Sequence, residues 1–349
     1  MKLCTMIKQH RRHYITTTVT ILACGLLILS CGKSVDRSDA GLEQKLARFC
    51  EQNNVTILVT DSGLGGLSVM AGIEKNLREW NLFDSVQLVF CNALPDNDHT
   101  YNSMESTAEK VRVFNAALTG MNAKYHPDII LIACNTLSVI SPQTAFASAT
   151  DIPVVGIVDF GVDLMYERLQ TDSTSVVFIL GTGTTIGQNT HKHVLCSLGI
   201  APERIVTQTC DMLESEIQAD PSGDITRAMI DMYAYEASEK RDIADDAHPM
   251  VGLCCTHYGY AANVFKEAFE QLYDRPVTIL DPNVAMCAFL FDDHNRNRFD
   301  TTVLNVQVVS QAELSDDDRT AIAAMIASVS PATAEALRQY HREPSLFSF

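Results

Sequence analysis

The stretch Asp128–Thr136 reads DIILIACNT and predicts a buried strand that ends on a thiol, Cys134. Its apolar, mostly β-branched run follows a Pro-Asp turn signal, which is typical of a strand covered on both faces in a parallel sheet. Ligands of open α/β sheets bind just beyond the carboxyl ends of the strands. Cys134 is therefore placed for chemistry, although free cysteines are also among the most buried structural residues.

Three other stretches repeat this design. A second apolar run, Pro249–Tyr258 (PMVGLCCTHY), also ends on a thiol, Cys255. Two more stretches match one another, because Val55–Gly66 (VTILVTDSGLGG) and Val176–Gly187 (VVFILGTGTTIG) each read as a strand that runs into a glycine-rich turn.

The spacing of these motifs indicates an internal duplication. Asp61 and Cys134 lie 73 residues apart, and so do Thr182 and Cys255. One offset therefore superposes both pairs. Each copy would supply one thiol at a strand end, and two copies facing each other would place two thiols across one cleft.

Strands and helices alternate along the chain, which predicts an α/β fold. We expect two pseudo-symmetric lobes, each with a parallel sheet flanked by helices, and an active site in the cleft between them. We assign residues 55–155 together with 279–349 to the first lobe and residues 156–278 to the second.

Several elements are predicted in detail. We expect a strand over Pro153–Val158, a helix over Met104–Leu118 that ends at Gly120, and a polar loop over Asn92–Met104 that rims the cleft. Val277–Leu280 is expected to be a strand that returns to the first lobe. A capping-box pattern predicts a helix that begins after Ser315.

Residues 1–30 predict a lipoprotein signal peptide. They hold four basic residues and no acidic one, and their apolar core, 19–29, is shorter than the ~20 residues that span a bilayer. The segment ends ILSC, which resembles a bacterial lipobox with Cys31 as the lipidated residue. We therefore expect a protein anchored by lipid in the bacterial cell envelope, with residues 31–54 forming a tether and a leading helix. A plain signal peptide or an uncleaved anchor is the alternative.

The composition excludes some classes of function. The formal net charge of −17 argues against a nucleic-acid partner, because such binding depends on Lys and Arg. The cysteines after residue 31 lack the spacing of a disulfide scaffold, so we interpret most of them as free thiols. No motif has the spacing of zinc ligands, and we predict no metal site.

The chain resembles the cofactor-independent aspartate/glutamate racemases, and among them the glutamate racemases, from Val55 to about Met286. Several ordered motifs carry this resemblance. They are DSGLGG at 61–66, ACNT at 133–136, IPVVGIV at 152–158, GTGTT at 181–185 and CTHY at 255–258. The resemblance implies an isomerase that needs no cofactor, with a small amino-acid substrate and the option of homodimerisation.

Racemisation explains why two thiols belong together. The reaction removes the α-proton from one face and returns a proton to the other, so two acid/base groups must flank the α-carbon. A reference pKa of ~8.5 lets one cysteine be a thiolate while the other is a thiol. The resemblance assigns Cys134 to one face and Cys255 to the other.

The resemblance also implies the roles of neighbouring residues. Asp61 would lie beside Cys134 and His257 beside Cys255, each helping to set the protonation of its thiol, and Glu214 falls where relatives carry an assisting glutamate. Each has a structural alternative, since Asp61 could cap a helix and His257 could be a core histidine. The residues expected to bind the carboxylate and ammonium groups of the substrate are Asp61, Ser62, Asn135, Thr136, Thr256 and His257.

The sequence departs from the family pattern in the loop after the second strand. Relatives carry Pro-Tyr-Gly where this chain has Pro95-Asp96-Asn97, and Asp96 would repel a side-chain carboxylate. Three hypotheses follow. The first is a racemase that interconverts L- and D-glutamate, aspartate or a related amino acid. The second is another enzyme of the superfamily that uses one thiol. The third is a non-catalytic lipoprotein that binds amino acids or cell-wall fragments.

Overall fold

The computed structural model describes residues 39–291 and 293–349. The predicted signal peptide, Cys31 and most of the tether lie outside these residues. Within the described ranges, no helix is both long and apolar enough to cross a membrane.

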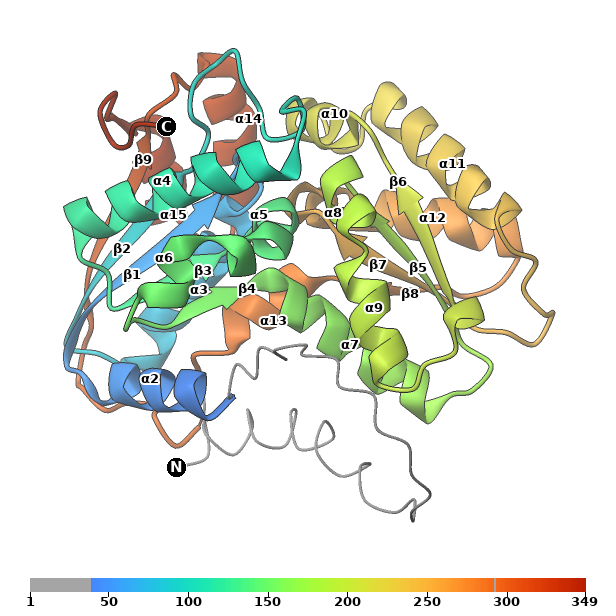
Figure 1. The fold of residues 1–349 in the computed structure, drawn as a ribbon, viewed down its shortest axis with the longest axis horizontal. Helices are drawn as coiled ribbons and strands as arrows, with labels where there is room; N and C mark the ends of the chain where they lie inside the picture. Colours follow the sequence, from blue (N-terminus) through green and yellow to red (C-terminus); the bar gives the residue numbers. More distant parts are fainter. Residues whose placement is uncertain (1–38, 292) are drawn as a thin grey trace, which may run out of the picture.

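Two parallel sheets lie side by side, and helices cover them (Figure 1). The first sheet has the strand order β10-β9-β2-β1-β3-β4, and the second has the order β6-β5-β7-β8. The strands of the first sheet are β1 (Asn54–Asp61), β2 (Ser85–Asn92), β3 (Ile129–Ile132), β4 (Val154–Gly156), β9 (Val303–Ser310) and β10 (His341–Arg342). Those of the second are β5 (Val176–Gly181), β6 (Ile205–Thr209), β7 (Pro249–Cys254) and β8 (Thr278–Leu280).

The strand orders confirm the duplication that the motif spacing predicts. The order β2-β1-β3-β4 in the first sheet corresponds to β6-β5-β7-β8 in the second, and all these neighbours pair in parallel. The first sheet is extended by β9 and β10 at one edge. The predicted α/β fold with two pseudo-symmetric lobes is therefore confirmed.

Apolar strands form the centre of each lobe. Every residue of β3, β5 and β7 is buried, as continuous apolar runs in a parallel sheet require. Burial of one Leu or Ile side chain contributes about 1.5–3 kcal/mol. The Pro-Asp turn before β3 is fixed by the Asp128 carboxylate, which accepts a 2.7 Å hydrogen bond from the Thr56 amide of β1.

Helices pack on both sheets and join the two lobes. The helices of the first lobe and of the connection are α2 (Asp39–Glu51), α3 (Leu67–Trp80), α4 (Thr107–Tyr125), α5 (Asn135–Ile140), α6 (Ala145–Ala149), α7 (Ile157–Thr171), α13 (Pro282–Ala288), α14 (Asp316–Ile326) and α15 (Pro331–Arg338). Those of the second lobe are α8 (Gly183–Gln188), α9 (Thr190–Ser197), α10 (Leu213–Ala219), α11 (Asp224–Glu239) and α12 (Ala262–Tyr273). Between the lobes, α13 packs against α3 on one side and α7 on the other.

Some predicted elements differ from the structure. Val277–Leu280 does not return to the first lobe, because β8 pairs with β7 in the second sheet, and the predicted boundary at residue 279 falls inside that strand. The helix expected to end at Gly120 continues to Tyr125. A Cβ at Gly120 would lie 2.1 Å from the Leu346 carbonyl oxygen, so this glycine serves close packing of the C-terminal segment instead of helix termination.

Candidate active site

The two thiols lie at equivalent strand ends. Cys134 follows β3 and is the N-cap of α5, and Cys255 follows β7 and is the N-cap of the short 3-10 helix η4 (Thr256–Ala261). Their residues are only 4% and 8% exposed. The segments that follow them are joined across the lobes, because Thr256 bonds to Asp61 of the first lobe and Thr136 lies 2.8 Å from Thr182 of the second. The fold therefore brings the two predicted thiols together where the lobes meet.

Ser62 contacts the Cys134 thiol. Its Oγ lies 3.2 Å from the Cys134 Sγ, and the Leu137 amide donates to the same sulfur at 3.4 Å. Burial raises the pKa of the Cys134 thiol, and the negative charge of Asp61 raises it further. The hydrogen bonds from Ser62 and Leu137 favour the thiolate and so oppose this rise.

Asp61 accepts hydrogen bonds from the glycine-rich turn that follows it and from a residue of the second lobe. Its Oδ2 accepts hydrogen bonds from the Gly66 amide at 2.5 Å and from the Thr256 hydroxyl at 2.8 Å, and its Oδ1 accepts one from the Gly63 amide at 3.3 Å. Asp61 therefore has the structural role that its position before a glycine-rich turn allows. It also lies close enough to Cys134 to act on that thiol through its charge.

His257 and Glu214 lie beside Cys255. The His257 Nδ1 is 3.9 Å from the Cys255 Sγ. Burial raises the pKa of Cys255 well above its ordinary value, and the next contribution is the charge of Glu214. Burial lowers the pKa of His257, although the carboxylates of Asp61, Glu214 and Asp318 oppose this change. A neutral imidazole is thus favoured next to the thiol.

The loop over Asn92–Met104, expected to rim the cleft, contacts the second lobe. The Asn102 side chain donates a 3.1 Å hydrogen bond to the Glu214 Oε1 on α10. Asp96 is held within the loop by His99, whose Nδ1 lies 2.9 Å from its carboxylate. Tyr101 is buried and donates to the Ala93 carbonyl at 3.2 Å.

Three buried polar atoms at this site have no hydrogen-bond partner among the described residues. They are the Oδ1 and Nδ2 of Asn135 and the Oε2 of Glu214. Buried polar atoms are normally paired, so these three are candidate contacts for a ligand or a water molecule. In contrast, the Thr136 hydroxyl is 2.8 Å from that of Thr182, and Thr256 is already bonded to Asp61.

Sequence reasoning assigned no role at the site to Thr182, Thr185 or Gln218. Thr182 and Thr185 lie in the GTGTT motif and bond through their hydroxyls at 3.1 Å. The 73-residue spacing marked Thr182 as the counterpart of Asp61, and this signal could have identified it. Gln218 lies 3.0 Å from His257 through its Oε1, and only the tertiary structure reveals that contact.

The remaining cysteines of the described chain are free thiols, as expected. Cys254 packs in the core cluster of Cys134, whereas the adjacent Cys255 packs in that of α11 and α12, so the two side chains point to opposite faces of β7. Across residues 39–291 and 293–349, no three His, Cys, Asp or Glu side chains are grouped to hold a metal ion.

Comparisons with known proteins identify the family that the chain resembles. A family model described as Asp/Glu/Hydantoin racemase matches residues 57–290. The chain is 27% identical to a glutamate racemase of Hydrogenobaculum sp. over 199 residues, which cover 57% of this chain and 68% of the relative. It is 28% identical to the glutamate racemase of Agrobacterium fabrum over 234 residues, covering 66% of this chain and 77% of the relative.

Solved structures show the same fold. Glutamate racemase from Francisella tularensis, in complex with D-glutamate, aligns with a TM-score of 0.59 at 21% identity over 78% of this chain and 94% of that one. Glutamate racemase from Aquifex pyrophilus aligns with a TM-score of 0.55 at 21% identity, again over 78% and 94%.

Proposed function

The chain belongs to the Asp/Glu/Hydantoin racemase family, and from this premise we propose that it interconverts L- and D-glutamate without a cofactor. The observation that carries the proposal is the pair of buried thiols, Cys134 and Cys255, at equivalent strand ends of the two lobes. The glutamate racemases among its relatives support glutamate as the substrate.

The chemistry needs one thiolate and one thiol. The thiolate of one cysteine takes the α-proton from the amino acid, and the thiol of the other delivers a proton to the opposite face of the carbanion. The first sulfur ends protonated and the second ends as a thiolate, so the reverse reaction starts from the product of the forward one. Ser62 hydrogen-bonds to Cys134. The His257 Nδ1 lies close enough to the Cys255 Sγ to accept the proton of that thiol.

The unpaired polar atoms fit an amino acid. The Asn135 amide can donate to the substrate carboxylate, and the buried Glu214 Oε2 can accept from its ammonium group. The charge of Asp96 lies against His99, which lessens the repulsion that the sequence suggests for a substrate with a second carboxylate. Asp96 is therefore a weaker obstacle to glutamate than the sequence suggests.

Exchange of the α-proton tests the proposal. The full chain, purified under reducing conditions, would be incubated in D2O with the L- and D-forms of glutamate, aspartate and a panel of neutral amino acids, and followed by NMR. Exchange with inversion on glutamate is the expected result. Inversion of aspartate alone would change the proposed substrate to aspartate. If no amino acid of the panel exchanges its α-proton while the thiols are reduced, a binding protein or a single-thiol enzyme is favoured.

We also propose that residues 1–30 direct export and that Cys31 carries a lipid anchor in the bacterial envelope. The basic start, the apolar core and the ILSC ending of the sequence support this placement. Labelling cells with a palmitate analogue should mark the wild-type chain and not Cys31→Ser. Unlabelled wild-type protein in the cytosolic fraction would contradict the proposal.

A further inference from the structure

A chain of hydrogen bonds connects Cys255 to helix α14 of the first lobe. The His257 Nδ1 faces the Cys255 Sγ at 3.9 Å, and the His257 Nε2 lies 3.0 Å from the Gln218 Oε1. The other end of the Gln218 amide donates from Nε2 to the Asp318 Oδ1 at 2.6 Å. Gln218 belongs to α10 and Asp318 to α14, two helices that lie side by side (Figure 1).

This chain determines which nitrogen of His257 carries the proton. The Asp318 carboxylate can only accept, so it orients the Gln218 amide with its nitrogen toward α14 and its oxygen toward His257. An amide oxygen also only accepts, so the His257 Nε2 must carry a hydrogen. The Nδ1 of the neutral ring therefore presents its lone pair to Cys255. Burial favours this neutral ring, because it lowers the pKa of His257.

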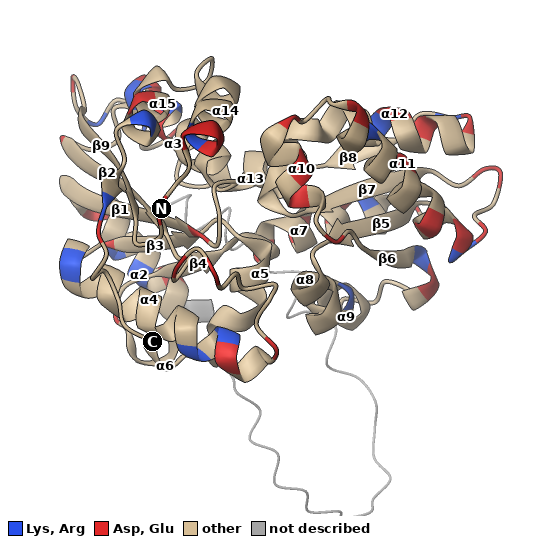
Figure 2. Cartoon of the chain, turned by 90° about the horizontal axis from the view of Figure 1, so that it is seen from above, with Lys and Arg blue, Asp and Glu red and all other residues tan. Residues whose placement is uncertain are grey.

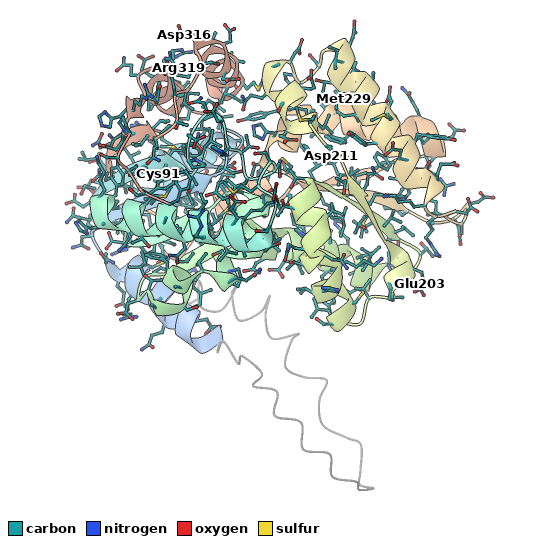
Figure 3. The ribbon with its side chains drawn as sticks, turned by 45° about the horizontal axis from the view of Figure 1, so that its top comes forward. Cys91, Glu203, Asp211, Met229, Asp316 and Arg319 are labelled. Atoms are coloured by element: carbon teal, nitrogen blue, oxygen red, sulfur yellow. The ribbon has the colours of Figure 1, made fainter. Side chains whose placement is uncertain are left out.

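Asp318 is itself held firmly. The Ser315 hydroxyl donates to the Asp318 Oδ2 at 2.7 Å, and the Asp318 amide donates back to the Ser315 Oγ at 3.0 Å, which forms the helix cap that the sequence predicts. Next to it, Asp316 pairs with Arg319 on the same helix (Figure 3). Figure 2 shows acidic residues on both α14 and α10.

The two helices belong to different lobes. Ile322 and Ile326 of α14 pack in the core of the first lobe, whereas Leu213 and Ile217 of α10 pack in that of the second. The bond from Gln218 to Asp318 therefore exists only while the lobes are together.

We propose that Gln218 and Asp318 are positioning residues that hold the His257 Nδ1 lone pair toward Cys255 across the boundary between the two lobes. The inference rests on the proposed function, in which Cys255 exchanges a proton with the substrate. At rest the thiol and the neutral ring are the favoured pair. During turnover the Cys255 S–H passes its proton to Nδ1, and the charges of Asp61, Glu214 and Asp318, which oppose the effect of burial on the His257 pKa, stabilise the imidazolium. The ring keeps its Nε2–H bond to Gln218.

NMR of the full chain with 15N-labelled histidine tests the positioning directly, because the ring 15N shifts distinguish the two tautomers. The His257 signals are assigned by their loss in His257→Asn. We expect the Nε2–H form in the wild type and a mixture of both forms in Asp318→Ala and Gln218→Leu. Asp317→Ala is the matched control, since it removes a neighbouring charge from the same helix turn. Gln218→Leu keeps the α14 cap intact should Asp318→Ala fold poorly.

Kinetics provide the second measurement. Both positioning variants should turn over about tenfold more slowly than Asp317→Ala, with the rising limb of the pH–rate profile moved to higher pH because Cys255 lacks an oriented base. If Asp318→Ala and Gln218→Leu keep the Nε2–H tautomer, the proposal is wrong whatever their rates. If the wild type turns over no amino acid of the panel, the proposed function fails, and the NMR result still decides whether the chain positions His257.

Discussion

The Asp61 carboxylate accepts a 2.8 Å hydrogen bond from the Thr256 hydroxyl, which joins the glycine-rich turn of the first lobe to the thiol segment of the second. Thr182 and Thr136 make the reciprocal contact, also at 2.8 Å. Asp61 and Thr182 are equivalent in the duplicated halves. In each lobe, the polar residue at the strand end therefore bonds to a residue just after the thiol of the other lobe. The contacts that connect the two lobes thus lie next to the two thiols.

Loss of this contact should destabilise the protein. Thr256→Val removes a donor from the buried Asp61 carboxylate, and we expect the free energy of unfolding to fall by about 1–3 kcal/mol. Thr256→Ser keeps the hydroxyl and should lose less. Urea unfolding measures both variants, and an unchanged free energy of unfolding in Thr256→Val, which keeps a methyl group but lacks the hydroxyl, would show that the hydrogen bond does not contribute.

The two adjacent cysteines of the second lobe should respond differently to substitution. Cys255→Ser replaces a proposed acid/base thiol with a poorly ionised hydroxyl, and we expect racemisation to fall about 10²–10⁴-fold. Cys254→Ser is the matched control, because its side chain points into the core on the other face of β7. Circular dichroism would first confirm that both variants fold. Comparable activity in the two variants would contradict the two-thiol mechanism.

Buried thiols should make the protein less stable at alkaline pH. Burial raises the folded-state pKa values of Cys91, Cys134, Cys254 and Cys255 above the ordinary value of ~8.5. The unfolded chain therefore loses these protons first. Stability is full below pH ~8.5 and falls above it, by up to ~1.4 kcal/mol per pH unit for each thiol.

Urea unfolding between pH 7 and pH 10 measures this slope. Cys91→Ala removes one buried thiol far from the proposed chemistry in sequence, and its slope above pH 8.5 should be smaller than that of the wild type. An unchanged slope would show that Cys91 does not contribute to the alkaline loss of stability.

Features that depend on local patterns and on motif spacing could be predicted from the sequence. The 73-residue spacing led to the duplicated lobes, and the apolar runs led to the buried strands that end on Cys134 and Cys255. The contact of Gln218 with His257 spans 39 residues, and its bond to Asp318 spans 100. Neither carries a local signal, because Gln218 reads as an ordinary polar position of a helix.

Short or ambiguous segments account for the wrong predictions. The three residues of β8 could pair with either sheet, since an apolar run of that length does not specify its neighbour. Gly120 reads as a helix end, yet it accommodates the Leu346 backbone, a contact made by the distant C-terminus. In both cases tertiary packing overrides the local preference.

The glycine-rich turn provides the sharpest test of how closely the lobes must approach. A Cβ at Gly65 would lie 2.6 Å from the Thr256 Oγ1, 2.7 Å from the His257 Nδ1 and 2.8 Å from the His257 backbone nitrogen. These atoms belong to the thiol segment of the second lobe, and the backbone nitrogen cannot move without displacing that segment. Gly65→Ala should therefore push His257 away from Cys255 and cost about 1–3 kcal/mol of stability.

Gly63→Ala is the matched control in the same turn. Its Cβ would meet only the His257 Cε1 at 3.5 Å, an ordinary van der Waals distance. We expect Gly65→Ala to lose racemisation at least about tenfold while Gly63→Ala stays near the wild type, because only the first forces the lobes apart. Steady-state rates on glutamate, with urea unfolding of both variants, measure the difference. Equal activity in the two would mean that the turn can yield without disturbing His257, and the close approach of Gly65 would then have no role in placing the second thiol.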